Sequence, residues 1–360
     1  MARVRRLVGA VGILLAAAFG SIGALSGAET SDGRIALLVA LLGLGRREPC
    51  CLGRHASQRH GVLAGDGPGR VREGDTRGHS AAGAQGTGRE RRYGNLDPGT
   101  GVTGTGRGTK RHERPPDTDR RPTIVFLHGT RLNGAAWASQ VAGLGDEFHC
   151  LAPDLPGHGD ADHVPFTVDG AASSIIELIE GEAQDGRAIL VGLSLGGYVA
   201  MAVAARRPDL IAGLAISGAT AEPVGLRSVV FHGLATIFSV VPETILDRVN
   251  RWFFGWRFPA AIAGPILADG FSFAGGAVAV RSLVGRRFKP LLAAYPGPSL
   301  LINGEFDLFF RPTERSFAAV AADPRRVLIP KATHLANLDQ PERFTAAIRR
   351  FAEGIGSPDG

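Results

Sequence analysis

The segment that most limits the fold of this chain is a serine between glycines, placed where one apolar run ends and an alanine-rich run begins. Residues 188–191 are predicted to form a strand and residues 198–205 a helix, so the chain must turn sharply between them. Gly192 and Gly196 lie two residues before and after Ser194, where side chains would collide as strand and helix pass closely. This pattern is typical of a nucleophile elbow, which lifts a serine hydroxyl clear of a sheet. The alternative is a glycine-rich turn that carries no chemistry.

The residue after this serine is expected to help stabilise negative charge. Leu195 would begin the helix, so its backbone N–H has no partner within the helix and lies at the positive end of the helix dipole. A donor placed there can stabilise an oxyanion. The turn therefore predicts a nucleophile, Ser194, together with a donor for the charge that its attack creates, the backbone N–H of Leu195.

From residue 122 onward the chain alternates apolar strand-like runs with helix-like runs. Strands that are apolar on both faces, separated by helices, predict an α/β fold with a mostly parallel sheet and helices on both sides. Ligands in such sheets bind at the carboxyl ends of the strands. The expected strands are residues 123–127, 148–152, 188–191, 210–217, 299–303 and 326–329, and the expected helices are residues 137–144, 171–180, 198–207, 312–321 and 341–351.

Five motifs follow these strands in chain order. They are Phe126-Leu127-His128-Gly129, Ala152-Pro153-Asp154-Leu155-Pro156-Gly157-His158-Gly159, Gly192-Leu193-Ser194-Leu195-Gly196-Gly197, Asn303-Gly304-Glu305-Phe306-Asp307 and Ala332-Thr333-His334-Leu335-Ala336-Asn337-Leu338. Over residues 122–352 the chain resembles the α/β-hydrolase fold superfamily, most closely the branch of pimeloyl-carrier-protein methyl esterases, carbon–carbon bond hydrolases and cofactor-free haloperoxidases. The resemblance implies an α/β-hydrolase fold: a mostly parallel central sheet, helices on both faces and a helical cap insertion.

A serine hydroxyl is a weak nucleophile and needs a base, which in turn needs a carboxylate to hold it in the right tautomer. The resemblance implies that His334 is this base and Asp307 the carboxylate, in the chain order that the fold uses. Both follow predicted strands, so they are expected at the same edge of the sheet as Ser194. Glu305 and Glu222 are competing carboxylates, because Glu305 is a near neighbour and some relatives place the acid after the preceding strand.

The loop after the first strand is expected to supply the second oxyanion donor. This donor is the backbone N–H of Thr130, which follows the His-Gly pair and would act with that of Leu195. His128 is expected to support the loop rather than to transfer protons. Asp154 and His158 are expected to hold together the strand-end turn that contains them.

Residues 222–290 interrupt the alternation and hold ten of the chain's 24 aromatic residues. In the family that the chain resembles, an insertion at this point is a helical cap over the active site, and its apolar content predicts an apolar substrate. The aromatic residues could instead form the core of the cap itself. Five arginines are candidates for binding a substrate carboxylate, and the sequence does not choose among them: Arg227, Arg248, Arg251, Arg257 and Arg281.

Residues 1–47 are predicted to form a membrane anchor or signal region. Three arginines precede an uncharged run, residues 7–28, which is long enough to cross a bilayer of about 30 Å. No clear cleavage site follows, which favours a retained transmembrane helix with the rest of the chain outside the cytoplasm. A second apolar run, residues 35–45, leaves a two-helix hairpin as the alternative, and a hairpin would return the domain to the cytoplasm.

Residues 48–121 are predicted to be a disordered linker, because few large apolar side chains stand among many glycines and arginines. The segment also lacks the alternating apolar pattern of the β-hairpin that usually precedes the first strand in hydrolases of this type. We hypothesise that a shifted reading frame or a wrong start produced part of it. Resequencing the locus tests this, and an uninterrupted frame with the same translation would contradict it.

The excess of basic over acidic residues is confined to the first third of the chain. Residues 1–121 hold 20 arginine or lysine residues against 11 acidic ones, whereas residues 122–360 hold 20 against 23. No nucleic-acid partner is therefore expected for the folded part. The three cysteines fit no zinc pattern, and no metal or cofactor is implied.

These observations predict a membrane-anchored or exported serine hydrolase that cleaves a small or medium apolar carboxylic ester through an acyl-serine intermediate. A carbon–carbon bond hydrolase and a cofactor-free haloperoxidase on the same fold are the enzymatic alternatives. A ligand-binding protein without turnover is the alternative from another class. The sequence leaves the oligomeric state open.

Overall fold

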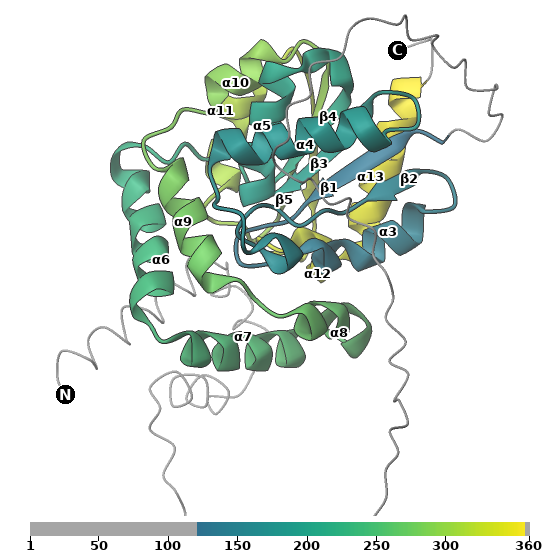
Figure 1. The fold of residues 1–360 in the computed structure, drawn as a ribbon. Helices are drawn as coiled ribbons and strands as arrows, with labels where there is room; N and C mark the ends of the chain where they lie inside the picture. Colours follow the sequence, from purple (N-terminus) through teal and green to yellow (C-terminus); the bar gives the residue numbers. More distant parts are fainter. Residues whose placement is uncertain (1–120, 357–360) are drawn as a thin grey trace, which may run out of the picture. The chain divides into compact units, whose positions relative to one another are not determined.

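The computed structural model describes residues 121–356, which contain one six-stranded sheet (Figure 1). Along the sheet the strands run in the order β2-β1-β3-β4-β5-β6, and every neighbouring pair is parallel. This arrangement confirms the predicted α/β class. The strands are β1 (Thr123–Leu127), β2 (His149–Leu151), β3 (Ala188–Leu193), β4 (Ile211–Ser217), β5 (Pro298–Gly304) and β6 (Asp323–Ile329).

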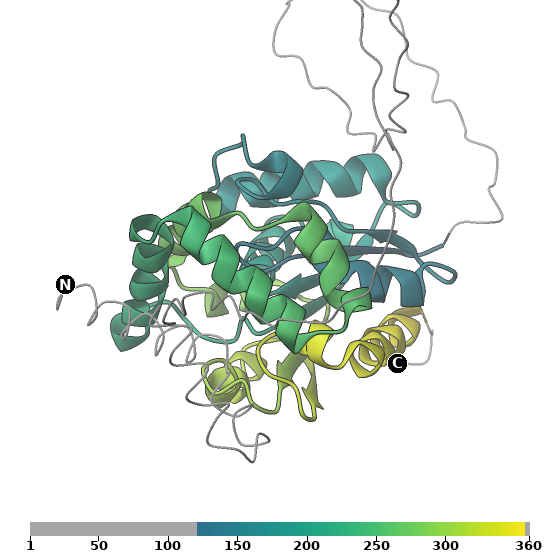
Figure 2. The same cartoon turned by 90° about the horizontal axis from the view of Figure 1, so that it is seen from below.

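Helices cover both faces of the sheet (Figure 2). Among them are α3 (Ala138–Leu144), α4 (Val168–Glu182), α5 (Leu195–Arg206) and α13 (Pro341–Gly356). In β1, Val125 and Leu127 belong to the apolar cluster that includes α4 and α5, whereas Ile124 and Phe126 belong to the cluster that includes α3 and α13. Successive side chains of a strand point to opposite faces, so a sheet covered on both sides needs strands that are apolar throughout.

Side-chain caps mark where two of the helices begin. Thr167 precedes α4, and its side chain accepts a hydrogen bond from the N–H of Gly170 at 2.9 Å. Asn133 does the same for the short 3₁₀ helix η2 (Gly134–Trp137), where its side chain accepts from the N–H of Ala135 at 3.0 Å. By contrast, α5 begins directly after Ser194 without a side-chain cap.

The segment between β4 and β5 forms the predicted helical insertion, and we call residues 222–290 the cap. It contains η5 (Gly225–Arg227), α6 (Ser228–Val240), α7 (Glu243–Arg257), α8 (Ala260–Asp269) and α9 (Phe273–Leu283), and it leads into α10 (Lys289–Ala294). Figure 1 shows α6 and α9 packed side by side at one end of the sheet, and α7 and α8 in a further layer. A small apolar cluster of its own holds α6, α7 and α9 together.

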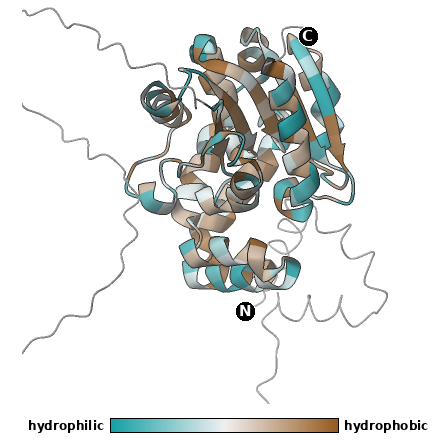
Figure 3. Ribbon diagram, turned by 90° about the vertical axis from the view of Figure 1, so that its right-hand side faces the viewer, coloured by the Kyte–Doolittle hydropathy of each residue, from teal (hydrophilic) through white to brown (hydrophobic). Residues whose placement is uncertain are grey.

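Several elements differ from their predicted bounds. The predicted helix at residues 312–321 consists of η6 (Arg311–Thr313) and the short α11 (Glu314–Ala318). Strand β6 begins at Asp323, three residues before the predicted start, because its first half is an exposed and charged part of an edge strand, where apolar patterning gives no signal. Figure 3 shows the change from polar to apolar along this strand. The remaining elements are η3 (Gly159–Ala161), η4 (Pro208–Leu210) and α12 (Ala336–Asp339).

The predicted anchor at residues 1–47, including the transmembrane helix at residues 7–28, and the predicted linker at residues 48–121 lie almost wholly outside the described residues. None of the helices within residues 121–356 combines the length and the apolar character that crossing a bilayer requires. Two bent pairs, α6 with α7 and α8 with α9, reach that length and composition only together, with bends of 113° and 93°.

Candidate active site

Ser194 lies at the sharp turn between β3 and α5, with φ at 51° and ψ at −111°. A positive φ is uncommon outside glycine, and only two other non-glycine residues of the described chain adopt one. The flanking glycines have the predicted steric role. A Cβ on Gly192 would lie 2.4 Å from the carbonyl oxygen of Gly196, and a Cβ on Gly196 would lie 2.1 Å from that of Leu127. The turn therefore requires glycine at both positions.

His334 and Asp307 come together at the carboxyl ends of β6 and β5. The Nδ1 atom of His334 lies 2.9 Å from Oδ2 of Asp307, and both side chains are buried. The other carboxylate oxygen, Oδ1, accepts the N–H of Phe310 at 3.0 Å, which fixes the carboxylate. When Nδ1 donates its proton to Asp307, Nε2 is left as the acceptor nitrogen of the ring.

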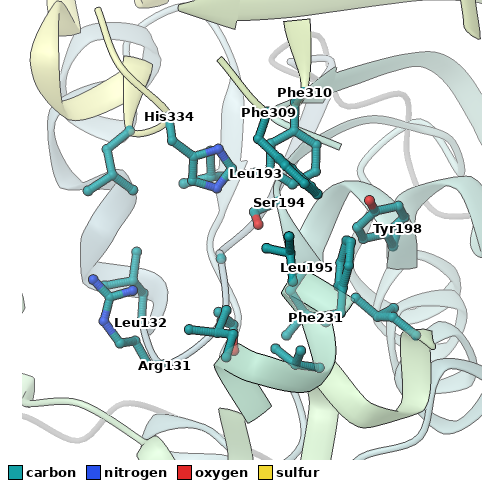
Figure 4. A pocket seen from close by; sticks show the side chains of 17 residues that line it. Arg131, Leu132, Leu193, Ser194, Leu195, Tyr198, Phe231, Phe309, Phe310 and His334 are labelled. Atoms are coloured by element: carbon teal, nitrogen blue, oxygen red, sulfur yellow. The ribbon is translucent and has the colours of Figure 1, made fainter. Parts of the chain in front are cut away.

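Ser194 and His334 border the same cavity (Figure 4). The ring of Phe310 stacks on that of His334, with centroids 4.9 Å apart and planes 19° apart. Gly218 lies against the histidine from another side, because a Cβ built there would be 2.6 Å from Cε1 of His334. The imidazole is thus held by Asp307, by an aromatic face and by a glycine that leaves room for it.

The two predicted oxyanion donors border this cavity as well. Within the described chain, the backbone N–H groups of Thr130 and Leu195 donate no hydrogen bond to another protein group. The next N–H along, that of Gly196, is already bonded to the carbonyl of His128 at 3.1 Å. Two unpaired donors, on residues that border the same cavity as Ser194, can bind a negative oxygen that develops there.

The competing carboxylates are engaged elsewhere. Oε2 of Glu305 accepts the backbone N–H of Lys331 at 2.9 Å. Oε1 of Glu222 accepts the N–H groups of Phe288 and Lys289 at 3.0 and 2.9 Å, so it holds the start of α10. Asp307 is the carboxylate that contacts His334.

Both ring nitrogens of His128 bind the backbone. Nε2 accepts the N–H of Leu155 at 2.9 Å, and Nδ1 lies 2.9 Å from the carbonyl of Gly129 and donates to it. Burial lowers the pKa of His128 to about 4, so the ring is neutral at physiological pH. No nitrogen of this ring is left for proton transfer, in keeping with a supporting role.

Asp154 and His158 hold the turn after β2. The two carboxylate oxygens of Asp154 accept the N–H groups of Gly134 and Asp160 at 2.7 and 2.8 Å. Nδ1 of His158 lies 3.0 Å from the carbonyl of Pro156. Burial, and secondarily the neighbouring His128, lowers the pKa of His158 to about 3. Both side chains therefore fix backbone around the site, as the sequence predicts.

Lowering the pH from 8 to 5 is expected to destabilise the fold by about 2 kcal/mol through each of His128 and His158. Their pKa values are lowered in the fold, so below about pH 6.5 the unfolded chain binds protons that the folded chain does not. Urea unfolding at pH 8, 6.5 and 5 measures this. The free energy of unfolding should fall less steeply with falling pH in His128→Gln than in the wild type. His163→Gln, at an exposed position, should have the wild-type slope of unfolding free energy against pH. An unchanged slope in His128→Gln would contradict the assignment.

The cavity wall is mostly apolar, and Arg131 is its only permanently charged side chain. The cavity encloses about 660 Å³ of space, which includes its opening to solvent. Apart from the residues already named, its wall consists of Leu132, Leu193, Tyr198, Val230, Phe231, Leu234, Val280, Leu283, Phe309 and Leu335. Helices α6 and α9 of the cap supply half of these, so the cap covers the serine.

Of the cap residues that the sequence analysis considered, only Phe231 lines this cavity. None of the five candidate arginines borders it, and Arg131, which does, lies outside the cap. Of the ten aromatic residues in the cap only Phe231 borders the cavity, whereas Phe253, Phe254 and Phe258 pack on one another. Trp252 and Trp256 stack on each other at the exposed surface. The sequence carried no signal for Arg131. It lies in the loop after β1, from which only a backbone N–H group, that of Thr130, was expected to contribute to the site.

Metal ligation has no evident site in the described chain: nowhere within residues 121–356 do three or more histidine, cysteine or acidic side chains come together to hold an ion.

The chain is similar in sequence to known hydrolases. The sequence model of the Alpha/beta hydrolase family matches residues 124–347. A pimeloyl-[acyl-carrier protein] methyl ester esterase of Neisseria meningitidis is 27% identical over 260 residues, which cover 68% of this chain and 99% of that protein. An AB hydrolase superfamily protein of Gibberella zeae is 36% identical over 98 residues, 27% of this chain and about a third (35%) of its own length.

Among solved structures, a thermophilic esterase from Thermogutta terrifontis is similar to this chain with a TM-score of 0.57 and 28% identity. The match covers 66% of this chain and 91% of the esterase.

Proposed function

Starting from the fact that this chain belongs to the alpha/beta hydrolase family, and is a hydrolase, we propose that it cleaves small or medium apolar carboxylic esters through Ser194, His334 and Asp307. The observation that carries this proposal is the hydrogen bond between His334 and Asp307 at the edge of a cavity that Ser194 also borders.

In the proposed reaction, the Ser194 hydroxyl attacks the ester carbonyl while Nε2 of His334 takes its proton. Asp307 keeps the ring in the tautomer that can accept this proton and stabilises the imidazolium that forms. The negative oxygen is bound by the N–H groups of Thr130 and Leu195, and one such donor can lower the barrier by roughly 3 kcal/mol.

The intermediate then collapses to an acyl-serine, and His334 gives its proton to the departing alcohol. Water enters next and attacks the acyl carbon while His334 takes its proton. His334 then gives this proton to the Ser194 oxygen as the acid leaves, which restores both residues. The same donors serve both halves of the cycle, because the oxyanion forms at the same place each time.

The apolar wall of the cavity supports an acyl group without charge. Apart from the site residues and Arg131, the side chains around the serine are aliphatic or aromatic, and burying apolar area provides the binding energy. The names of the relatives from Neisseria meningitidis and Thermogutta terrifontis, both esterases, support ester chemistry.

Labelling with a fluorophosphonate probe tests the proposal. The wild-type chain is expected to form a covalent adduct that is lost in Ser194→Ala and His334→Ala. Ser174→Ala, on the exposed side of α4, is the matched control and should label like the wild type. A folded wild-type protein that does not label would overturn the proposal and leave a binding role without turnover.

Phe231→Ala is expected to change chain-length preference. The Phe231 ring borders the cavity and packs between Tyr198 and Phe309, so its removal opens space for a longer acyl chain. The ratio of kcat/KM for nitrophenyl octanoate over acetate should rise about 10-fold. Phe238→Ala is the control, because Phe238 is buried on the same helix but does not border this cavity. An unchanged ratio would mean that the acyl chain binds elsewhere.

A further inference from the structure

The loop that carries the Thr130 donor is attached to the cap. After β1 the chain forms a turn in which the N–H of Leu132 bonds to the carbonyl of Gly129 at 3.2 Å. The carbonyl of Arg131 accepts the N–H of Ser272 at 3.0 Å, and Ser272 precedes α9. One residue beyond the turn, the side chain of Asn133 donates to the carbonyl of Gly270 at 3.1 Å. The geometry of this turn therefore depends on where the cap lies.

Arg131 occupies a position in this turn that favours glycine. It is the third of the four turn residues, and its φ is 60°. This is the left-handed region of backbone conformation, which is strained for any residue that has a Cβ atom. Glycine would adopt this backbone without strain. Strain of this kind persists only where the surroundings hold the residue in place, and the arginine side chain supplies one such interaction.

That interaction is a buried contact with cap helix α7. Nε of Arg131 donates to Oδ1 of Asn250 at 2.8 Å, and Nδ2 of Asn250 donates to the carbonyl of Leu246 at 2.8 Å, which fixes the amide. The guanidinium carbon lies 5.9 Å from the centre of the Phe254 ring. Burial lowers the pKa of Arg131 to about 9, so the group remains charged at neutral pH. Figure 4 shows Arg131 at the border of the cavity, away from Ser194.

We propose that Arg131 is a positioning residue that couples the cap to the oxyanion donor: its hydrogen bond to Asn250 holds the turn so that the N–H of Thr130 faces the cavity. This inference rests on the proposed function, because the donor matters only if an oxyanion forms. The Thr130 hydroxyl, 3.4 Å from the carbonyl of Gly276, gives the same turn a further link to the cap. Loss of the Arg131 contact should weaken transition-state binding and leave ground-state binding intact.

Arg131→Gly is the decisive variant. It relieves the strain at the positive φ and removes the contact with Asn250. If only the backbone conformation of residue 131 matters, kcat and stability should stay unchanged or rise. The coupling role predicts that kcat for a nitrophenyl ester falls about 10- to 100-fold while KM stays within about 3-fold. Asn250→Ala removes the other half of the contact and should act in the same way. The double variant should be no worse than either single one.

Asn250→Asp tests rescue, because it keeps an acceptor for Nε of Arg131. It should retain most of the wild-type kcat. Arg251→Gln is the matched control on the same helix, since Arg251 pairs with Asp247 at the exposed surface. It should leave kcat unchanged. The inhibition constant of a trifluoromethyl ketone, which forms an oxyanion adduct with the serine, should rise in step with the fall in kcat/KM.

The coupling is overturned if Arg131→Gly keeps the wild-type kcat, if only KM changes, or if Asn250→Asp is as impaired as Asn250→Ala. If Arg131→Gly does not fold by circular dichroism, the two Asn250 variants decide. Fluorophosphonate labelling of the wild type separates the two proposals: a wild type that labels, with Arg131→Gly at full kcat, refutes the coupling alone, whereas a wild type that does not label refutes the proposed function.

Discussion

Asp307→Asn is expected to lower kcat by about 10⁴-fold with little change in stability. The carboxylate now accepts the proton of Nδ1 of His334 at 2.9 Å, and an amide at this position can instead donate to that nitrogen. The ring would then carry its proton on Nε2 and could not accept one from Ser194. Steady-state kinetics with a short nitrophenyl ester, together with urea unfolding of the same protein, measure both quantities.

Glu305→Gln and Glu222→Gln are the controls for this prediction. Their side chains bind backbone N–H groups away from His334, so kcat should stay within about 3-fold of the wild type. Glu222→Gln should cost some stability, because it weakens the start of α10. A fall in kcat in Glu222→Gln as large as that in Asp307→Asn would mean that the catalytic carboxylate is Glu222, after β4, and would contradict the assignment of Asp307.

Gly218→Ala is expected to lower kcat by about 10²-fold or more. A methyl group there would lie 2.6 Å from Cε1 of His334 and 2.7 Å from its Nδ1, so the ring must move away from its place beside Asp307. A shift of about 1 Å in a catalytic group is enough for a loss of this size. Kinetics on the variant, with a crystal structure to locate the displaced ring, test the expectation.

Gly225→Ala separates this clash from backbone strain. Gly225 has φ at 58°, close to the 57° of Gly218, but no atom lies within 4 Å of a Cβ built on it. Both variants should lose similar stability from the positive φ, whereas only Gly218→Ala should lose activity. Equal kcat in the two variants would mean that the imidazole tolerates the methyl group.

The sequence predicted the parts of the fold that are set by local pattern. Strand β1 has the predicted bounds at residues 123–127, because a run that is buried on both faces must be apolar throughout. The steric need for Gly192 and Gly196 could be inferred because the turn from strand to helix leaves no room for a side chain. For Asp307 and His334, chain order and the expected ends of the strands sufficed to place them together. Their chemical roles, with that of Ser194, stay predictions.

Other parts depend on contacts between distant segments, which pattern does not reveal. Arg131 meets Asn250 across 119 positions of sequence, and nothing near either residue indicates the pair. Gly218 looks like an ordinary glycine after a strand until the His334 ring is placed beside it. In the cap, composition located the insertion but could not separate aromatic residues that line the cavity from those that form its core, because both kinds are apolar.

Strand β6 has a consequence for how the protein behaves in concentrated solution. In the part of the chain that the structure describes it ends the sheet, and an unpaired edge is a template on which another chain can add a strand. Its first four residues, Asp323-Pro324-Arg325-Arg326, are exposed, and they combine a proline with three charges. Such an edge disfavours intermolecular pairing, so this end of the sheet is protected against aggregation.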